Sequence, residues 1–504
     1  MAFEKNSMLV SQKHNLDRKE FSVECTISAG ENVEKVLALC AGAFVKSSEV
    51  LDGTINYSGT VDLKLVFCNS EGFFNTVFSS CPFSSKFDSD AIEVGQDAFV
   101  TVKVLDYNVD SVQGDIVKVS VMLCQEGFTV SNKEIKTIGN GDDDECSLNE
   151  EIKVVKFVGK GSDEFVSTSE INIRDKVKKL ILTQSDVYLK NVESGVNFVS
   201  FSGDVVTRVL YLNDNDKFES GYVYDSFKQE VELDGVSREC LSEGYSFVKC
   251  DEVKTEIVQD EKGDKISVSV PVVLNAFAFC EESAIVTKDC YSTKGKLSLT
   301  TESFDNTLVC TMDTIEERVE GSITLDEEKP RVDKILFSGG NSVTITNKFV
   351  QDGSITIQGI AKTMVVYLND ELGSMQSVQI DIPFSINEKT SFKDGGILEV
   401  DAVLCDVDVS VKKGREIFVD GKVKLSLNYC YNSVDGVITD AILSEPFDEK
   451  DYSMEVVFAR KGQSLWDIAK MFNVKQEQII TQNPDTVFPL SEDASLVLFY
   501  QKVE

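Results

Sequence analysis

Cysteine and carboxylate are the side chains best placed to carry chemistry in this chain, because histidine is almost absent. The 504 residues include 13 Cys and a single His, His14. A Ser–His–Asp triad or a Cys–His pair would have to recruit His14, and a site with several histidine ligands is excluded. The sequence also lacks phosphate-loop, zinc-protease, nucleophile-elbow and dinucleotide motifs. We predict that the protein is not an enzyme and holds no cofactor.

The cysteines are scattered from Cys25 to Cys430, and no two of them form a C-x-x-C pair. An odd number at irregular spacing is typical of free thiols in a reducing compartment, not of a disulfide framework. We therefore predict that the cysteines are unpaired.

Two acidic stretches carry carboxylates of the kind that bind Ca²⁺. Residues 139–145 are rich in Asp but lack the alternating ligand positions and the closing Glu of a Ca²⁺ loop. Asp214 and Asp216 begin like such a loop, yet Phe218 stands at the third ligand position. We expect both stretches to be solvated loops and predict no metal site.

The charge balance excludes several classes of partner. Fifty Lys and Arg face 85 Asp and Glu, which gives a net charge of −35, nearly all of it before Glu455. So acidic a body repels phosphate backbones and anionic lipids, and we expect no nucleic acid and no membrane partner. No run of about 18 apolar residues occurs and residues 1–20 have no signal-peptide core, which favours a cytoplasmic protein without membrane insertion.

Apolar and turn residues recur at long, regular intervals. Tyr57-Ser58-Gly59 returns as Phe201-Ser202-Gly203, 144 residues later. The segment Gly203–Asp214 returns again as Gly359–Asp370. Internal similarity of this kind is typical of tandem structural units. We predict three units, at residues 15–164, 165–318 and 319–450.

The repeated segments alternate between apolar and polar residues, as strands with one buried face do. Val117, Val119 and Val121 are separated by polar residues, which places them on one face of a sheet. Pro271 interrupts its strand, which suits an edge strand or a bulge. The sequence therefore predicts a mainly β protein, whose three tandem repeats are antiparallel β-sandwich or barrel-like domains.

The units also share short motifs. Each opens with an apolar K/V-x-[IVL] segment and carries an F-S-G or Q-G hairpin. In this respect residues 15–450 resemble the SPOCS domain (DUF3794) of spore-forming Firmicutes. The resemblance implies a β-rich fold and a role in sporulation.

The sequence changes in character at Glu455. A short apolar strand, Val456–Phe458, is followed by a helix-start signal in which Ser464 can cap a helix with Asp467 as its capping-box partner. A second helix is expected over residues 476–482, before an Asn-Pro pair.

With a last strand over 496–500, this tail has the order β-α-α-β. Its G-[DQ]-[ST]-L-W-x-I-A motif, followed about twenty residues later by Asn-Pro, resembles a small LysM domain, which we place at residues 455–502. LysM domains bind chains of N-acetylglucosamine in a groove between the loop before the first helix and the loop after the second.

The resemblance implies a partner- or glycan-binding site in this tail. Its residues would be Gly462, Gln463, Ser464, Leu465, Trp466, Ile468, Asn483, Pro484 and Asp485. Gln463 replaces the usual Asp, and Lys475 replaces a helix-capping Ser or Thr. These departures leave the fold intact but favour a protein partner over a sugar.

Trp466 is the only tryptophan of the chain. Two roles are open for it. It can pack at the helix–sheet junction of a domain too small to have much core, or it can anchor a partner as a half-exposed aromatic. An amphipathic indole can do both.

Tandem SPOCS units followed by a terminal LysM domain resemble the SipL-like family of spore-coat morphogenetic proteins. The resemblance implies a non-enzymatic scaffold or adaptor in the mother-cell cytoplasm, at the forespore surface and spore coat. The LysM domain would dock a SpoIVA-type morphogenetic ATPase, while the β units contact other coat proteins or self-associate. The alternative is a LysM domain that binds peptidoglycan of the cell wall or spore cortex.

Overall fold

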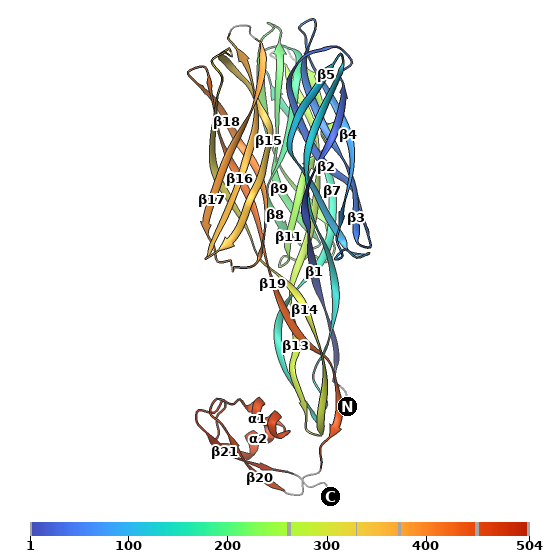
Figure 1. Cartoon of the computed structure of the whole chain (residues 1–504), viewed down its shortest axis with the longest axis vertical. Coiled ribbons are helices and arrows are strands. Elements are labelled where there is room, and N and C mark those ends of the chain that lie inside the picture. The colour runs from blue at the N-terminus through green and yellow to red at the C-terminus, as the bar shows by residue number, and fades with distance from the viewer. Residues whose placement is uncertain are drawn as a thin grey trace.

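Three β heads lie side by side at one end of an elongated molecule, above a narrow stalk of long strands (Figure 1). A small module with two helices lies beside the far end of the stalk. The computed structural model describes residues 3–259, 264–328, 330–370, 374–392, 394–448 and 453–500. The described residues contain no helix with the length and apolarity to cross a bilayer.

The first head is a sandwich of two antiparallel three-stranded sheets. The strand orders are β1 (Lys5–Ser28), β6 (Ile116–Ile138), β5 (Asp97–Gln113) in one sheet and β2 (Val33–Leu51), β3 (Thr54–Asn69), β4 (Phe74–Asp88) in the other. Val117, Val119 and Val121 of β6 are fully buried between the sheets. The predicted alternation and the mainly β fold are confirmed.

The second head repeats this plan with an interrupted edge. The strands are β7 (Glu145–Asn172), β13 (Lys265–Ser292), β11 (Leu241–Val248) and β12 (Lys254–Val258) in one sheet and β8 (Val177–Ser194), β9 (Phe198–Asn213), β10 (Phe218–Glu232) in the other. A single 3₁₀ turn, Cys250–Glu252, separates β11 from β12.

Pro271 lies in the central strand β13, so the prediction of an edge strand or bulge is wrong. On one side Pro271 pairs with Val166 of β7. On the other side the ladder with β11 ends at Val272 and the ladder with β12 begins at Ser269. The residue without an N–H therefore stands where the neighbouring strand is interrupted, which avoids the lost hydrogen bond.

The third head has the same two sheets, in the orders β14 (Gly295–Thr324), β19 (Glu416–Pro446), β18 (Ile397–Lys412) and β15 (Val332–Gln351), β16 (Ser354–Asn369), β17 (Met375–Lys389). The repeated sequence segments form the ends of equivalent strands, β9 and β16. Each head has its own apolar core between its two sheets.

The stalk is built from β1, β6, β7, β13, β14 and β19, which extend below the heads (Figure 1). One buried side chain from each strand meets in its core: Val10, Ile135, Val154, Val286, Phe304 and Val437. The predicted borders at 164/165 and 318/319 fall inside β7 and β14. The chain thus passes from the stalk into a head within one continuous strand.

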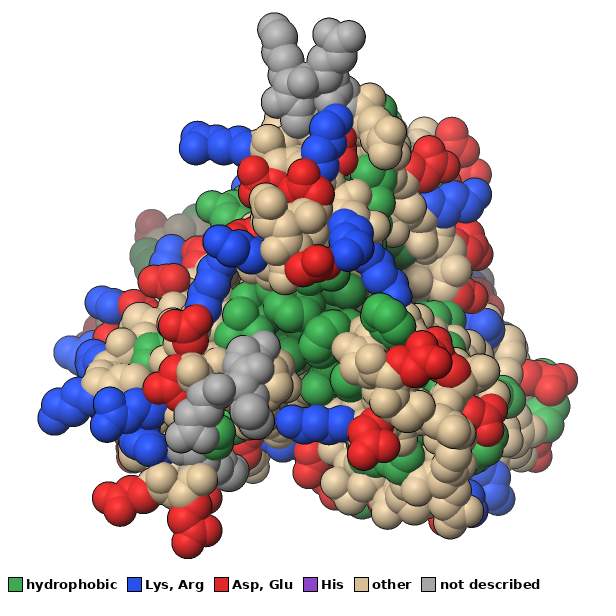
Figure 2. Space-filling view, turned by 90° about the horizontal axis from the view of Figure 1, so that it is seen from above, with side chains coloured by type: hydrophobic (Ala, Val, Ile, Leu, Met, Phe, Trp, Pro, Cys, Tyr) green, Lys and Arg blue, Asp and Glu red, His purple; other side chains and the backbone are tan. Residues whose placement is uncertain are grey.

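The heads also pack against one another. Strands β2, β8 and β15 contribute equivalent apolar pairs to a shared cluster: Leu37 and Ala38, Ile181 and Leu182, Leu336 and Phe337. Lys179 Nζ donates to the carbonyl of Phe74 at 2.7 Å, which ties the second head to the first. Viewed from the head end, hydrophobic side chains gather at the centre between three lobes (Figure 2). The three heads therefore form one body around an apolar centre.

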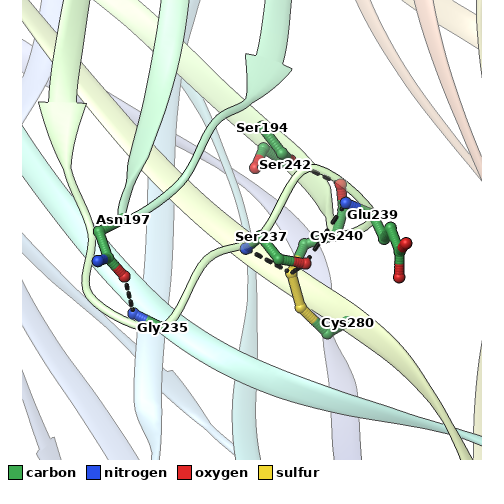
Figure 3. Close-up of a disulfide and its surroundings, with 8 residues drawn as sticks. All are labelled: Ser194, Asn197, Gly235, Ser237, Glu239, Cys240, Ser242 and Cys280. Carbon is green, nitrogen blue, oxygen red and sulfur yellow. Dashed lines mark hydrogen bonds between the residues drawn. A yellow bond between two sulfur atoms is a disulfide. The ribbon is translucent and has the colours of Figure 1, made fainter.

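Cys240 and Cys280 form a disulfide in the second head (Figure 3), so the prediction of unpaired cysteines is wrong for this pair. The register places Leu241 of β11 opposite Phe279 of β13. The adjacent residues Cys240 and Cys280 then face each other with Cα atoms 4.2 Å apart, close to the range that a disulfide spans. Ten other cysteines are free thiols. Cys310 lies outside the residues whose side chains are described.

Candidate partner-binding module

The C-terminal module has the predicted β-α-α-β order. Strand β20 (Met454–Ala459) pairs with β21 (Ala494–Phe499), and α1 (Leu465–Phe472) and α2 (Gln476–Gln482) come between them in sequence. Ile468, from the predicted site, is fully buried with Leu496 and Leu498 in the core of the module. Ile468 therefore supports the fold and is not accessible to a ligand.

Ser464 begins α1 with the predicted capping box. Its hydroxyl accepts a hydrogen bond from the Asp467 N–H at 3.1 Å, and the Asp467 carboxylate accepts one from the Ser464 N–H at 3.0 Å. Hydrogen bonds from the hydroxyl and the N–H of Ser464 lower the pKa of Asp467, because they stabilise its charged form. Lys475, at the start of α2, makes no such cap.

Trp466 packs against the tip of the stalk. Its ring meets Tyr291 of β13 edge to face, with ring centroids 5.0 Å apart. Its Nε1 donates to Asp289 Oδ2 at 2.9 Å, and the side chain keeps only 9% of its surface exposed. Trp466 shares a buried cluster with Ile468 and Leu496 of the module core, which agrees with the packing role and not with that of a half-exposed anchor. In addition, it joins the module to the stalk.

Two further contacts fix the same interface. Lys470 Nζ lies 2.6 Å from Asp289 Oδ1 and 2.7 Å from Asp289 Oδ2. The Tyr291 hydroxyl donates to the carbonyl of Val474, between the two helices, at 2.7 Å. The face of α1 that carries Trp466 and Lys470 is therefore turned towards β13.

Several polar groups of the predicted groove are bound within the module. Gln463 Oε1 accepts from the Arg460 N–H at 2.7 Å. Asn483 accepts from the Val497 N–H at 2.8 Å and donates to the Val497 carbonyl at 2.9 Å. Leu465 is half-buried against the module core. These residues hold the loops in place.

The remaining predicted residues, Gly462, Pro484 and Asp485, are exposed. The Gly462 N–H donates to the Leu490 carbonyl at 2.8 Å, and the Leu490 N–H donates to the Gln463 carbonyl at 3.1 Å. Within the described residues no hydrogen bond joins residues 462–465 to residues 483–485. The first loop is thus held by the segment before β21.

Two segments of the chain, residues 32–112 and 331–412, match the family model described as SipL, SPOCS domain. The matched segments comprise β2–β5 of the first head and β15–β18 of the third. No LysM model matches the C-terminal module. No curated protein and no solved structure matches the chain.

A cavity of about 240 Å³ lies between the SPOCS segments and the second head. Arg208 Nη1 is 3.2 Å from Asp186 Oδ2 beside this cavity. Burial raises the pKa of the thiols of Cys40 and Cys250, both on its wall, to about 12. These thiols stay protonated at neutral pH and are not activated nucleophiles.

Asp289 and Tyr291, which contact the module, are the residues of this interface that the sequence did not reveal. They occupy the end of a strand of the second unit, and no motif marks them. The end of β13 reaches the module only because the strand continues along the whole stalk. The described part of the chain holds no group of three or more His, Cys, Asp or Glu side chains able to bind a metal.

Proposed function

We propose that this protein is a non-enzymatic scaffold and adaptor in spore-coat assembly. Its C-terminal module docks a SpoIVA-type morphogenetic ATPase at the forespore surface, in the mother-cell cytoplasm. The two SPOCS segments support a role in spore-coat morphogenesis. The β-α-α-β tail supports the docking function through its resemblance to LysM domains.

The observation that carries this proposal is the position of the module. Trp466 and Lys470 hold it on Asp289 at the end of the stalk, opposite the heads. A body with a docking module at one end and SPOCS heads at the other suits a protein that joins two surfaces. The heads would then contact other coat proteins or further copies of the chain.

A protein partner fits the module better than a glycan. Sugar recognition needs free polar groups, yet Gln463 Oε1 and both ends of the Asn483 side-chain amide are bonded to the backbone. Pro484 and Asp485 stay exposed and form a small surface with one negative charge. Peptidoglycan binding is the alternative that an experiment must separate from ATPase binding.

The test is the affinity of the full chain for purified SpoIVA-type ATPase, measured by biolayer interferometry. Asp485→Arg reverses an exposed charge of the predicted site and should weaken binding about tenfold, equivalent to about 1.4 kcal/mol. Glu492→Arg makes the same charge change elsewhere on the module, at another exposed position, and should leave affinity unchanged. Equal losses of ATPase affinity in the two variants would contradict the assignment of Asp485 to the binding site.

A parallel sedimentation assay with purified peptidoglycan addresses the alternative. The full chain should stay in the supernatant. Retention on peptidoglycan that excess ATPase does not displace would contradict the proposed function and support glycan binding.

A further inference from the structure

The outer edge of β21 is closed by side chains. The Phe499 N–H donates to Gln482 Oε1 at 2.8 Å, and Gln482 Nε2 donates to the Phe499 carbonyl at 3.1 Å. Asn483 makes the same pair of bonds to Val497. These amides replace a neighbouring strand, so β21 has no free edge in this region.

The outer edge of β20 is open. The Tyr500 N–H donates to the Ser453 carbonyl at 2.9 Å. In an antiparallel ladder the inward-bonded residues alternate, so Glu455 and Val457 bond to β21. The N–H and C=O groups of Val456 and Phe458 therefore point away from β21. Within residues 453–500, no hydrogen bond satisfies these outward groups.

The side chains at this edge are apolar and exposed. Met454, Val456 and Phe458 keep 53%, 50% and 80% of their surface accessible, and Phe499 lies across from Met454 on the same face. Val457 and Ala459 point the other way, into the module core. An open strand edge with apolar side chains is the arrangement to which extended peptides add.

The edge is also accessible among all the residues that the structure describes. Figure 1 shows the helices of the module nearer the stalk and β20 on the side away from it. The contacts of Trp466 with Tyr291 and Asp289 keep the module in this orientation. Arg460 and Lys461 follow β20 directly and are exposed, which gives one end of the edge a positive charge.

We propose that β20 is a docking edge for an extended peptide segment of a partner protein, which adds to the two-stranded sheet as a third strand. The peptide bonds to the outward main-chain groups of Val456 and Phe458. It carries apolar side chains at alternate positions to cover Phe458, and an acidic residue beside Arg460 and Lys461. This inference rests on the proposed function, because it names the surface and the chemistry of the partner that the module docks.

The size of the edge favours a peptide over a second copy of the chain. Stable protein dimers usually bury about 1,200 Å² or more. One strand, Met454–Ala459, with three exposed apolar side chains offers much less than that. Peptides that add to a strand gain affinity from main-chain hydrogen bonds and need only such a short edge.

The first test uses a fluorescein-labelled peptide, Asp-Thr-Val-Thr-Val-Thr-Asp, and the full chain in a polarisation assay. Binding should fall about tenfold or more for Phe458→Lys, which places a charge on the edge, a loss of at least about 1.4 kcal/mol. Val456→Pro should have the same effect, because proline removes an outward N–H that the pairing with β21 does not use. The matched control is Ile480→Lys, which charges another exposed apolar residue of the module and should bind as the wild type does.

Fluorescence of Trp466, the sole tryptophan, shows whether each variant keeps the module folded and docked. Wild-type affinity in folded Phe458→Lys would overturn the proposal. A concentration-dependent dimer that this variant abolishes in analytical ultracentrifugation would overturn it too, because the occupant would then be a second copy.

The same variants with the SpoIVA-type ATPase separate this inference from the proposed function. ATPase binding that Phe458→Lys leaves intact contradicts the docking edge but not the adaptor role. Peptide binding at β20 without any ATPase binding contradicts the adaptor role but supports the edge. Loss of both ligands in Phe458→Lys, with both retained in Ile480→Lys, supports the two together.

Discussion

The indole N–H of Trp466 donates a hydrogen bond to the carboxylate of Asp289, which lies 177 residues earlier in the chain. Asp289 belongs to β13, close to the tip of the stalk. The same carboxylate also pairs with Lys470 of α1. Asp289 therefore accepts both polar contacts that α1 makes with the stalk, beside those of Tyr291.

Replacing Asp289 with Ala should release the module from the stalk. The substitution removes the acceptor of Trp466 and the partner of Lys470, with a loss of about 2 kcal/mol in docking free energy. The tryptophan emission of the full chain should shift to the red, and acrylamide should quench it more strongly. Glu282→Ala, at an exposed position of the same strand, should leave the emission unchanged. Identical spectra for wild type and Asp289→Ala would contradict this role of Asp289.

Tyr291→Phe should loosen the same interface without undoing it. The variant keeps the ring against Trp466 but removes the hydroxyl that donates to the Val474 carbonyl. The expected loss is about 1 kcal/mol, typical of one neutral hydrogen bond. Hydrogen–deuterium exchange should become faster in residues 465–474 and stay unchanged in the heads. No change in exchange at the module would show that the hydroxyl is not needed.

Stability should depend on pH through Glu243 of β11, which is buried beside Asn428 of β19 and Lys13 of β1. Burial raises the pKa of Glu243 to about 7 from an ordinary value of 4.5, although Lys13 lowers it in part. The folded protein then holds a proton that the unfolded chain releases, so this group makes stability fall as pH rises from 4.5 through 7. Asn428 Nδ2 donates to Glu243 Oε2 at 2.7 Å, a bond that glutamine can also accept.

Glu243→Gln should therefore remove this part of the pH dependence. In urea denaturation the variant should match the wild type near pH 5 and be more stable at pH 8.5, by up to about 3 kcal/mol. Glu281→Gln, at an exposed position, is the matched control. A constant difference between wild type and Glu243→Gln at both pH values would refute the assigned pKa.

The disulfide predicts a redox-dependent stability of the second head. It closes a loop with a sequence separation of 40, for which chain entropy gives about 4 kcal/mol of stabilisation. Dithiothreitol should lower the urea midpoint of the wild type but not of Cys240→Ser/Cys280→Ser. Alkylation in urea followed by mass spectrometry should label the ten free thiols and leave Cys240 and Cys280 unlabelled before reduction. Labelling of Cys240 and Cys280 in the unreduced protein would disprove the bond.

The sequence was sufficient where the structure is determined by near neighbours. The alternation of Val117, Val119 and Val121 predicted a strand with one buried face, because the side-chain period of a strand is local. The spacing of Ser464 and Asp467 likewise predicted the start of α1, since a capping box spans three residues.

The sequence was insufficient where a contact depends on register or on overall length. Cys240 and Cys280 meet only because of how β11 pairs with β13. Pro271 is tolerated in a central strand only because the gap between β11 and β12 falls beside it. Trp466 could be recognised as unusual, but its partner Asp289 depends on where the stalk ends.

The most direct test of the account is hydrogen–deuterium exchange of the full chain with and without the SpoIVA-type ATPase. We expect that the ATPase slows exchange in residues 453–500, most strongly along β20, and leaves the three heads unchanged. Protection confined to the heads, or protection of the module by peptidoglycan and not by the ATPase, would contradict it.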